Sequence, residues 1–150
     1  MEAAIVVVDT NVVSELVRSS PDPNVLKWFD DQDTYTLHLS AVVEAELRRG
    51  TALLPMGQRR NRLIVEIDTM IEDEFEGKVL PFERSAAYEF AKIYADRSAS
   101  GRPISFSDCL IAATARAHEA TVATRDVNDF DGCGIEIINP WKFKGFIRWI

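Results

Sequence analysis

Four acidic residues of this sequence occupy positions from which carboxylates could act together: Asp9, Glu46, Asp108 and Asp126. Each stands either just after an apolar run or in a predicted helix. If the four converge, their mutual repulsion raises their pKa values, and a cation would relieve it. A cluster of oxygen ligands without histidine suits Mg²⁺ or Mn²⁺. Such an ion can activate water and stabilise charge on a phosphate, so the pattern favours phosphodiester hydrolysis.

Three of these acids also have a purely local explanation. Asp9 could cap the helix that follows it. Asp108 completes Ser105-Phe-Ser-Asp108, which matches a capping box. Asp126 could form a turn or a cap, and Asp129 could do the same work. These alternatives stay open when each residue is taken singly.

Glu46 is harder to explain locally. Val42 and Val43 lie four and three residues before it, so Glu46 belongs to the apolar face of its predicted helix. Glu44, in contrast, precedes Arg48 by four residues, the spacing of a solvated ion pair. A buried carboxylate without a partner is costly, so we expect something to compensate Glu46.

Apolar runs alternating with helical patterns predict the elements that position these acids. The expected strands are Ile5–Val8, Thr36–Leu39, Val79–Phe82, Thr121–Thr124 and Ile135–Ile138. The expected helices are Val12–Arg18, Asn24–Asp31, Ser40–Leu53, Gln58–Phe75, Arg84–Arg97 and Ser105–His118, and residues 126–134 are expected to form a loop. This alternation predicts an α/β fold with a mostly parallel sheet. In such sheets ligands bind outside the carboxyl ends of the strands, where Asp9 and Asp126 fall.

Composition narrows the class of protein. The 150 residues suit one domain, which we assign to 1–150, and 47% of them are hydrophobic. The sequence contains no secretory signal and no apolar run long enough to cross a membrane. Cys109 and Cys133 form no CxxC pair, so we expect thiols in a reducing, cytoplasmic setting. A net charge of −7 argues against coating nucleic acid by charge alone.

Five segments in this order resemble the PIN-domain ribonucleases, and more narrowly the VapC-type toxins of the FitB-like branch. They are Val8–Glu15, Leu39–Gly50, Asp108–Ala113, Ala123–Asp126 and Asn139–Trp141. The resemblance runs from about residue 5 to 143. It implies a PIN-like α/β/α sandwich with a central, mostly parallel β-sheet, and RNA cleavage that depends on Mg²⁺ or Mn²⁺. It also implies a homodimer and a cognate antitoxin. The antitoxin's C-terminal segment would cover the active site, and operator DNA would be bound only through the antitoxin.

The resemblance assigns roles to individual residues. The family's catalytic, metal-binding acids fall on Asp9, Glu46, Asp108 and Asp126. Asn11 and Thr124 fall on supporting positions. The family often has Asn where this chain has Asp126, followed by an acid three residues later, so Asp129 competes as the fourth ligand. The apolar tail, residues 143–150, extends past the family's usual end.

Contacts to RNA phosphates require basic residues. The densest basic stretch contains Arg48, Arg49, Arg59, Arg60 and Arg62, which suit solvated helix faces, whereas Arg125 adjoins Asp126. We therefore expect Arg125 to bind substrate. Two other readings stay open: a non-catalytic module that binds a protein partner or a DNA-bound complex, and a phosphatase with Asp9 as nucleophile. The phosphatase pattern requires a second Asp two residues after Asp9, and this chain has Asn11 there.

Overall fold

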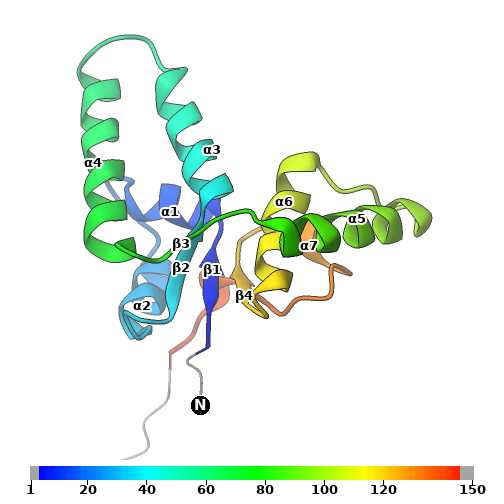
Figure 1. The fold of residues 1–150 in the computed structure, drawn as a ribbon. Coiled ribbons are helices and arrows are strands. Elements are labelled where there is room, and N and C mark those ends of the chain that lie inside the picture. Colours follow the sequence, from blue (N-terminus) through cyan, green and yellow to red (C-terminus); the bar gives the residue numbers. More distant parts are fainter. Residues whose placement is uncertain (1–3, 146–150) are drawn as a thin grey trace, which may run out of the picture.

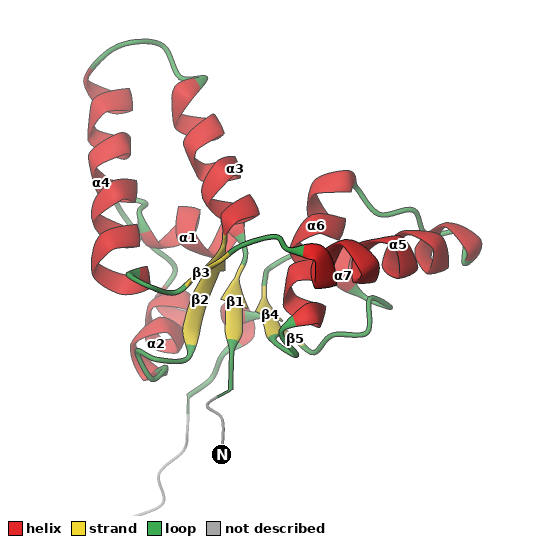
Figure 2. Cartoon of the chain, in the orientation of Figure 1, coloured by secondary structure: helices red, strands yellow, loops and turns green. Residues whose placement is uncertain are grey.

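Strand β1 (Val6–Val8) lies at the centre of a five-stranded sheet in the computed structural model, which describes residues 4–145. The strand order is β3 (Val79–Leu80), β2 (Leu37–Ser40), β1, β4 (Thr121–Ala123) and β5 (Ile137–Ile138) (Figure 2). Every neighbouring pair is parallel. The predicted α/β fold with a parallel sheet is confirmed.

Helices connect the strands and cover the sheet (Figure 1). They are α1 (Thr10–Leu16), α2 (Pro23–Asp31), α3 (Ala41–Ala52), α4 (Gln58–Phe75), α5 (Arg84–Ala99), α6 (Phe106–Ala117), α7 (Val127–Phe130) and a 3₁₀ turn at Pro140–Lys142. Polar side chains cap several of them, because the first N–H groups of a helix have no partner within it. Asp9, Ser40 and Ser105 accept those bonds for α1, α3 and α6. Asp22 caps α2 and Asn139 caps the 3₁₀ turn.

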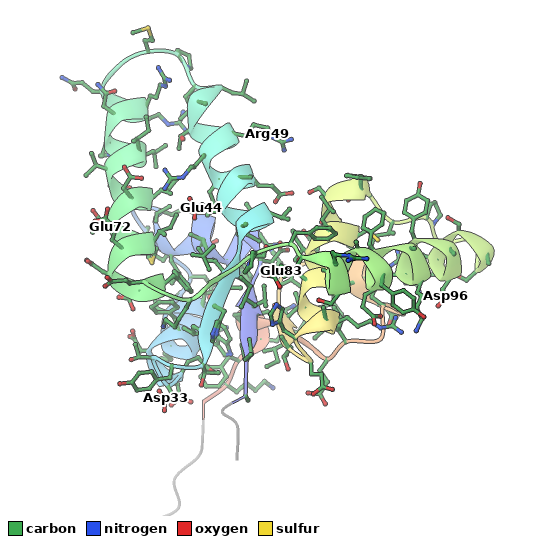
Figure 3. All side chains as sticks on the ribbon, viewed as in Figure 1. Asp33, Glu44, Arg49, Glu72, Glu83 and Asp96 are labelled. Atoms are coloured by element: carbon green, nitrogen blue, oxygen red, sulfur yellow. The ribbon has the colours of Figure 1, made fainter. Side chains whose placement is uncertain are left out.

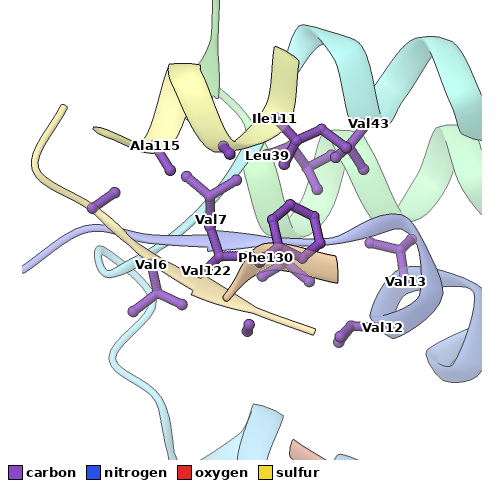
Figure 4. Packing of buried hydrophobic residues seen from close by; sticks show 14 of the residues in the cluster. Val6, Val7, Val12, Val13, Leu39, Val43, Ile111, Ala115, Val122 and Phe130 are labelled. Carbon is purple, nitrogen blue, oxygen red and sulfur yellow. The ribbon is translucent and has the colours of Figure 1, made fainter. Parts of the chain in front are cut away.

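The core forms on both sides of β1, because successive side chains of a strand point to opposite faces. Val7 lies on the side of α3 and α6 with Val43, Ile111 and Ala115, and Val6 lies on the other side (Figure 4). All but Val6 in this group are fully buried. Burial on both faces accounts for the uninterrupted β-branched run that predicts this strand.

Helices α3 and α4 form an antiparallel pair that projects away from α5, while α3 still contacts α6 (Figure 1). The predicted apolar stripe of α4 faces inward, with Ile67 and Ile71 buried. Arg48 of α3 bonds Glu44 at 2.9 Å and Asp68 of α4 at 2.7 Å. The prediction of an ion pair for Glu44, which lies on α3 in Figure 3, is therefore confirmed.

The loop expected at residues 126–134 contains the short helix α7, because Phe130 is buried and the Asp129 N–H closes one turn on the Asp126 carbonyl at 3.0 Å. Of the apolar tail, Phe143 packs against the core, whereas residues 146–150 lie outside the described residues. Between residues 4 and 145, no helix is long and apolar enough to cross a membrane.

Candidate active site

The sheet changes its winding direction between β1 and β4, and the four predicted acids meet at the carboxyl ends of these two strands. Chain connections run outward from there, which leaves a crevice at the switch point. A cavity of about 450 Å³ opens at this place, and its lining includes Asp9, Glu46, Asp108 and Asp126. We call it the acidic cleft. Asp9 follows β1 and Asp126 follows β4, whereas Glu46 lies in α3 and Asp108 in α6.

Asp9 is the most buried of the four, with 5% of its surface exposed. One carboxylate oxygen accepts the Thr10 N–H at 2.8 Å. The other accepts the Thr124 hydroxyl at 2.8 Å and the Asn11 amide at 3.3 Å. Burial raises the pKa of Asp9 to about 6 against the lowering effect of these bonds, and the charges of Asp108 and Glu46 raise it further. Asp9 therefore caps α1 and also has the character of a site residue.

Glu46 is oriented by hydroxyl groups from two other helices. The Thr10 hydroxyl donates to one of its carboxylate oxygens, and the Ser107 hydroxyl donates to the other. These bonds tie α1, α3 and α6 together at the cleft. They provide the compensation expected for a carboxylate on this face. Neither Thr10 nor Ser107 is among the site residues expected from the sequence, although each is adjacent to one of the acids, Asp9 or Asp108.

Asp108 lies in the first turn of α6 and is half-buried. Its N–H donates to the Ser105 hydroxyl at 3.1 Å, so the cap expected at Ser105 is present. Burial raises the pKa of Asp108, the Ser105 hydroxyl opposes that shift, and the charges of Asp129, Glu46 and Asp126 add to it. Capping by Ser105 satisfies the backbone, and the Asp108 carboxylate still lines the acidic cleft.

Asn11 connects the acids that follow β1 and β4. Its amide donates to Asp126 at 3.0 Å and to the Thr124 hydroxyl at 3.2 Å, besides Asp9. Its carbonyl oxygen accepts the Arg125 N–H at 3.3 Å. Thr124 in turn accepts the Asp126 N–H at 3.0 Å. Asn11 and Thr124 thus join Asp9 and Asp126 in one hydrogen-bond network.

Asp126 and Asp129 differ in whether they line the acidic cleft. Asp126 lines both the acidic cleft and a neighbouring cavity of about 480 Å³, whereas Asp129 lines the neighbouring cavity but not the cleft. Asp129 is nevertheless close enough for its charge to raise the pKa of Asp108. This geometry favours Asp126 as the fourth acid of the cleft, with Asp129 at its rim.

Basic residues reach the cleft from two sides. Arg125 lines it, and its guanidinium lies 5.3 Å from the centre of the Trp141 ring. Arg18 lines it as well, while donating to both carboxylate oxygens of Glu15 at 2.9 Å. Arg59 and Arg62 line an adjoining cavity of about 490 Å³ that shares Thr10, Ser14, Arg18 and Glu46 with the cleft. Within the basic stretch, Arg48 bonds acids of α3 and α4.

The donor set of the cleft suits a hard divalent cation, because it consists of carboxylate oxygens supported by hydroxyl and amide groups. Neighbouring carboxylates raise the pKa values of Asp9 and Asp108 by charge repulsion, which a cation would relieve. Across residues 4–145, however, no three acidic, thiol or imidazole side chains lie close enough together to hold a metal ion as they stand. The residues fit such an ion in chemistry, and some of their side chains would have to close in on it.

Comparisons with known proteins show which family this chain resembles. The family model described as PIN domain matches residues 6–132. The chain is 44% identical to VapC ribonuclease Y4jK of Sinorhizobium fredii over 91% of this chain and 98% of that protein. It is 39% identical to toxin FitB of Neisseria gonorrhoeae over 91% of this chain and 98% of FitB. A solved structure of FitAB bound to an IR36 DNA fragment superposes with a TM-score of 0.87 at 37% identity, covering 94% of this chain and 99% of that one.

Proposed function

The chain belongs to the PIN-domain family, and from that premise we propose that it is the toxin of a toxin–antitoxin pair and acts as a metal-dependent endoribonuclease. The observation that carries this proposal is the acidic cleft itself. Four carboxylates from four separate parts of the chain line one cavity at the switch point of the sheet. Helix capping explains Asp9 and the backbone of Asp108, but it gives no reason for Glu46 and Asp126 to face the same cavity.

We assign Asp9, Glu46, Asp108 and Asp126 as the residues that hold Mg²⁺ or Mn²⁺. When bound, such an ion supplies a more acidic water and stabilises charge on a phosphate group. The chain's own contribution is orientation. Thr10 and Ser107 fix the Glu46 carboxylate, and Asn11 and Thr124 fix Asp9 and Asp126. None of the carboxylates needs to act as a nucleophile in this scheme.

The substrate we propose is RNA, held through its phosphates beside the cleft. Arg125 is the best-placed cation, because it lines the cleft and its guanidinium lies over the Trp141 ring. A guanidinium can bind a phosphate through two parallel hydrogen bonds, which fixes the phosphate in direction as well as distance. The net charge of −7 makes such local contacts necessary, because the protein as a whole repels nucleic acid.

The partner we propose is a cognate antitoxin whose C-terminal segment covers the acidic cleft, and operator DNA is bound only through that antitoxin. The names and titles of the relatives support this, since one is toxin FitB and the FitAB structure contains a DNA fragment. We also propose a homodimer and a cytoplasmic location, where the buried thiols of Cys109 and Cys133 stay reduced. Sedimentation that shows only monomer at micromolar concentration would contradict the dimer.

The decisive experiment is cleavage of a labelled RNA by wild type and Asp9→Asn, each with Mg²⁺, with Mn²⁺ and with EDTA. We expect wild type to cut only with a metal and Asp9→Asn not to cut. Equal cutting by both proteins would indicate a contaminating nuclease. Absence of cutting in every condition, while both proteins bind a partner equally well, would favour the non-catalytic module instead.

A further inference from the structure

Arg97 is a buried cation near the end of α5, with 6% of its surface exposed. Within residues 4–145 its guanidinium makes no ion pair with a carboxylate. Burying a charge without a countercharge is costly, so a protein keeps one only where polar groups compensate it. The hydrogen-bond acceptors that compensate Arg97 indicate its structural role.

The compensation comes from backbone carbonyls on two segments. Nε of Arg97 donates to the Arg102 carbonyl at 2.6 Å, in the turn after α5. One terminal nitrogen donates to the carbonyls of Asp129 at 2.8 Å and Asp131 at 3.0 Å, and it lies 3.6 Å from the Cys133 sulfur. The planar Arg97 guanidinium therefore binds the backbone at the end of α7 and just beyond it.

The segment bound by Arg97 directly follows Asp126, which lines the acidic cleft. The Asp129 N–H donates to the Asp126 carbonyl at 3.0 Å, so fixing residue 129 also fixes the turn that begins at Asp126. Helix α7 has only four residues, and Asp126 gives it no side-chain cap. So short a helix is marginal by itself, because its nucleation cost is not repaid by further turns. Its stability must come from tertiary contacts, of which Arg97 supplies several.

We propose that Arg97 is a positioning residue, whose buried guanidinium fixes the backbone of residues 126–133 and so holds Asp126 and Asp129 at the acidic cleft. This inference rests on the proposed function only in so far as Asp126 acts there. Lysine could not replace Arg97, because one ammonium cannot present donors in the fork geometry that meets separate carbonyls. Methionine would fill similar volume but leave those carbonyls without a donor.

The experiment compares Arg97→Lys and Arg97→Met with Arg102→Met. Arg102 is the matched control, since it holds the same segment from outside: it bonds the Asp131 carboxylate at 2.9 Å and the Asn128 carbonyl at 3.3 Å, and its side chain is 45% exposed. The first readout is amide hydrogen exchange of the metal-free proteins. We expect the Asp129 and Cys133 amides to exchange at least about tenfold faster in Arg97→Met, with β1 unchanged.

The second readout is Mn²⁺ binding together with steady-state RNA cleavage. Because Arg97 acts through residues that hold the ion, we expect Arg97→Met to lower Mn²⁺ affinity and kcat by about 10- to 100-fold, with KM for RNA little changed. Arg102→Met should change each quantity by less than about threefold, because exposed ion pairs contribute little. If Arg97→Met does not fold, Arg97→Lys decides the matter, since it keeps the charge and loses the fork.

Three results would overturn the proposal: faster exchange spread evenly over the whole chain, unchanged kcat and Mn²⁺ affinity in a folded Arg97 variant, or an equal effect of Arg102→Met. A wild-type protein that neither binds Mn²⁺ nor cuts RNA would refute the proposed function instead. In that case local exchange at Asp129 and Cys133 still shows whether Arg97 fixes the segment.

Discussion

Replacing Asp9 by Asn removes a charge that the metal-free fold holds at a cost. Burial is the largest cause of that cost, and Asp108 and Glu46 add to it. Raising the pKa from 3.8 to about 6 disfavours the ionised form by roughly 3 kcal/mol, since each pKa unit corresponds to about 1.4 kcal/mol. Asn has nearly the same shape and no charge, so it should recover most of this energy.

Part of the gain is offset by lost hydrogen bonds. The Asp9 oxygen that accepts from Thr124 and Asn11 becomes an amide nitrogen, which cannot accept. At about 1 kcal/mol for each such bond, the net gain should be about 1–2 kcal/mol near neutral pH. Asp9→Asn should therefore be more stable than wild type when no metal is present.

The dependence on pH identifies Asp9 as the source. Its pKa is higher in the folded protein than in the unfolded chain, so the folded state binds the extra proton between about pH 4 and pH 6. This contribution to wild-type stability is fully present below about pH 4 and is lost as the pH rises through about 6. The advantage of Asp9→Asn should accordingly vanish, or reverse, near pH 4.

The assay is urea unfolding of both proteins in EDTA, once at neutral pH and once near pH 4, with Asp96→Asn as the control. Asp96 is exposed on α5 (Figure 3) and reports the general effect of removing one negative charge from an acidic protein. With Mn²⁺ added, wild type should gain stability by mass action and Asp9→Asn should not. The reasoning is refuted if Asp9→Asn gains the same stability at both pH values, or no more than Asp96→Asn at neutral pH.

Three further predictions concern the other side chains of the cleft. Asp126→Asn should lower kcat by at least about tenfold, and Asp129→Asn should lower it by clearly less, because residues outside the ligand set contribute smaller effects. Equal losses in steady-state cleavage would show that both acids act directly. Arg125→Ala should weaken RNA affinity several-fold and reduce its salt dependence, since one phosphate contact is lost; unchanged affinity in a filter-binding titration would remove the assignment. Ser107→Ala should lower kcat and Mn²⁺ affinity by about tenfold, because Glu46 loses one of its two orienting hydroxyls. Wild-type affinity in a calorimetric titration with Mn²⁺ would contradict this role of Ser107.

The sequence by itself determined the features that local chemistry controls. A run of β-branched residues ending in Asp9 predicts a buried strand followed by a capped helix, and both are present. Ser105 caps its helix as its spacing predicts, and Glu44 pairs with Arg48. Such features depend on neighbours within about four residues, and they can therefore be predicted without knowledge of the tertiary structure. The parallel sheet followed from the same alternation of strands and helices.

Only the tertiary structure decided which distant groups meet. Thr10 and Ser107 reach Glu46 from positions 36 and 61 residues away along the chain, and no local pattern pairs them. Asp126 lines the acidic cleft and Asp129 does not, although only two residues separate them in the sequence. Arg97 reads in sequence as one more polar residue of a helix, yet it is buried against three carbonyls. These contacts close long loops between elements, so their energies depend on packing that no short stretch of sequence specifies.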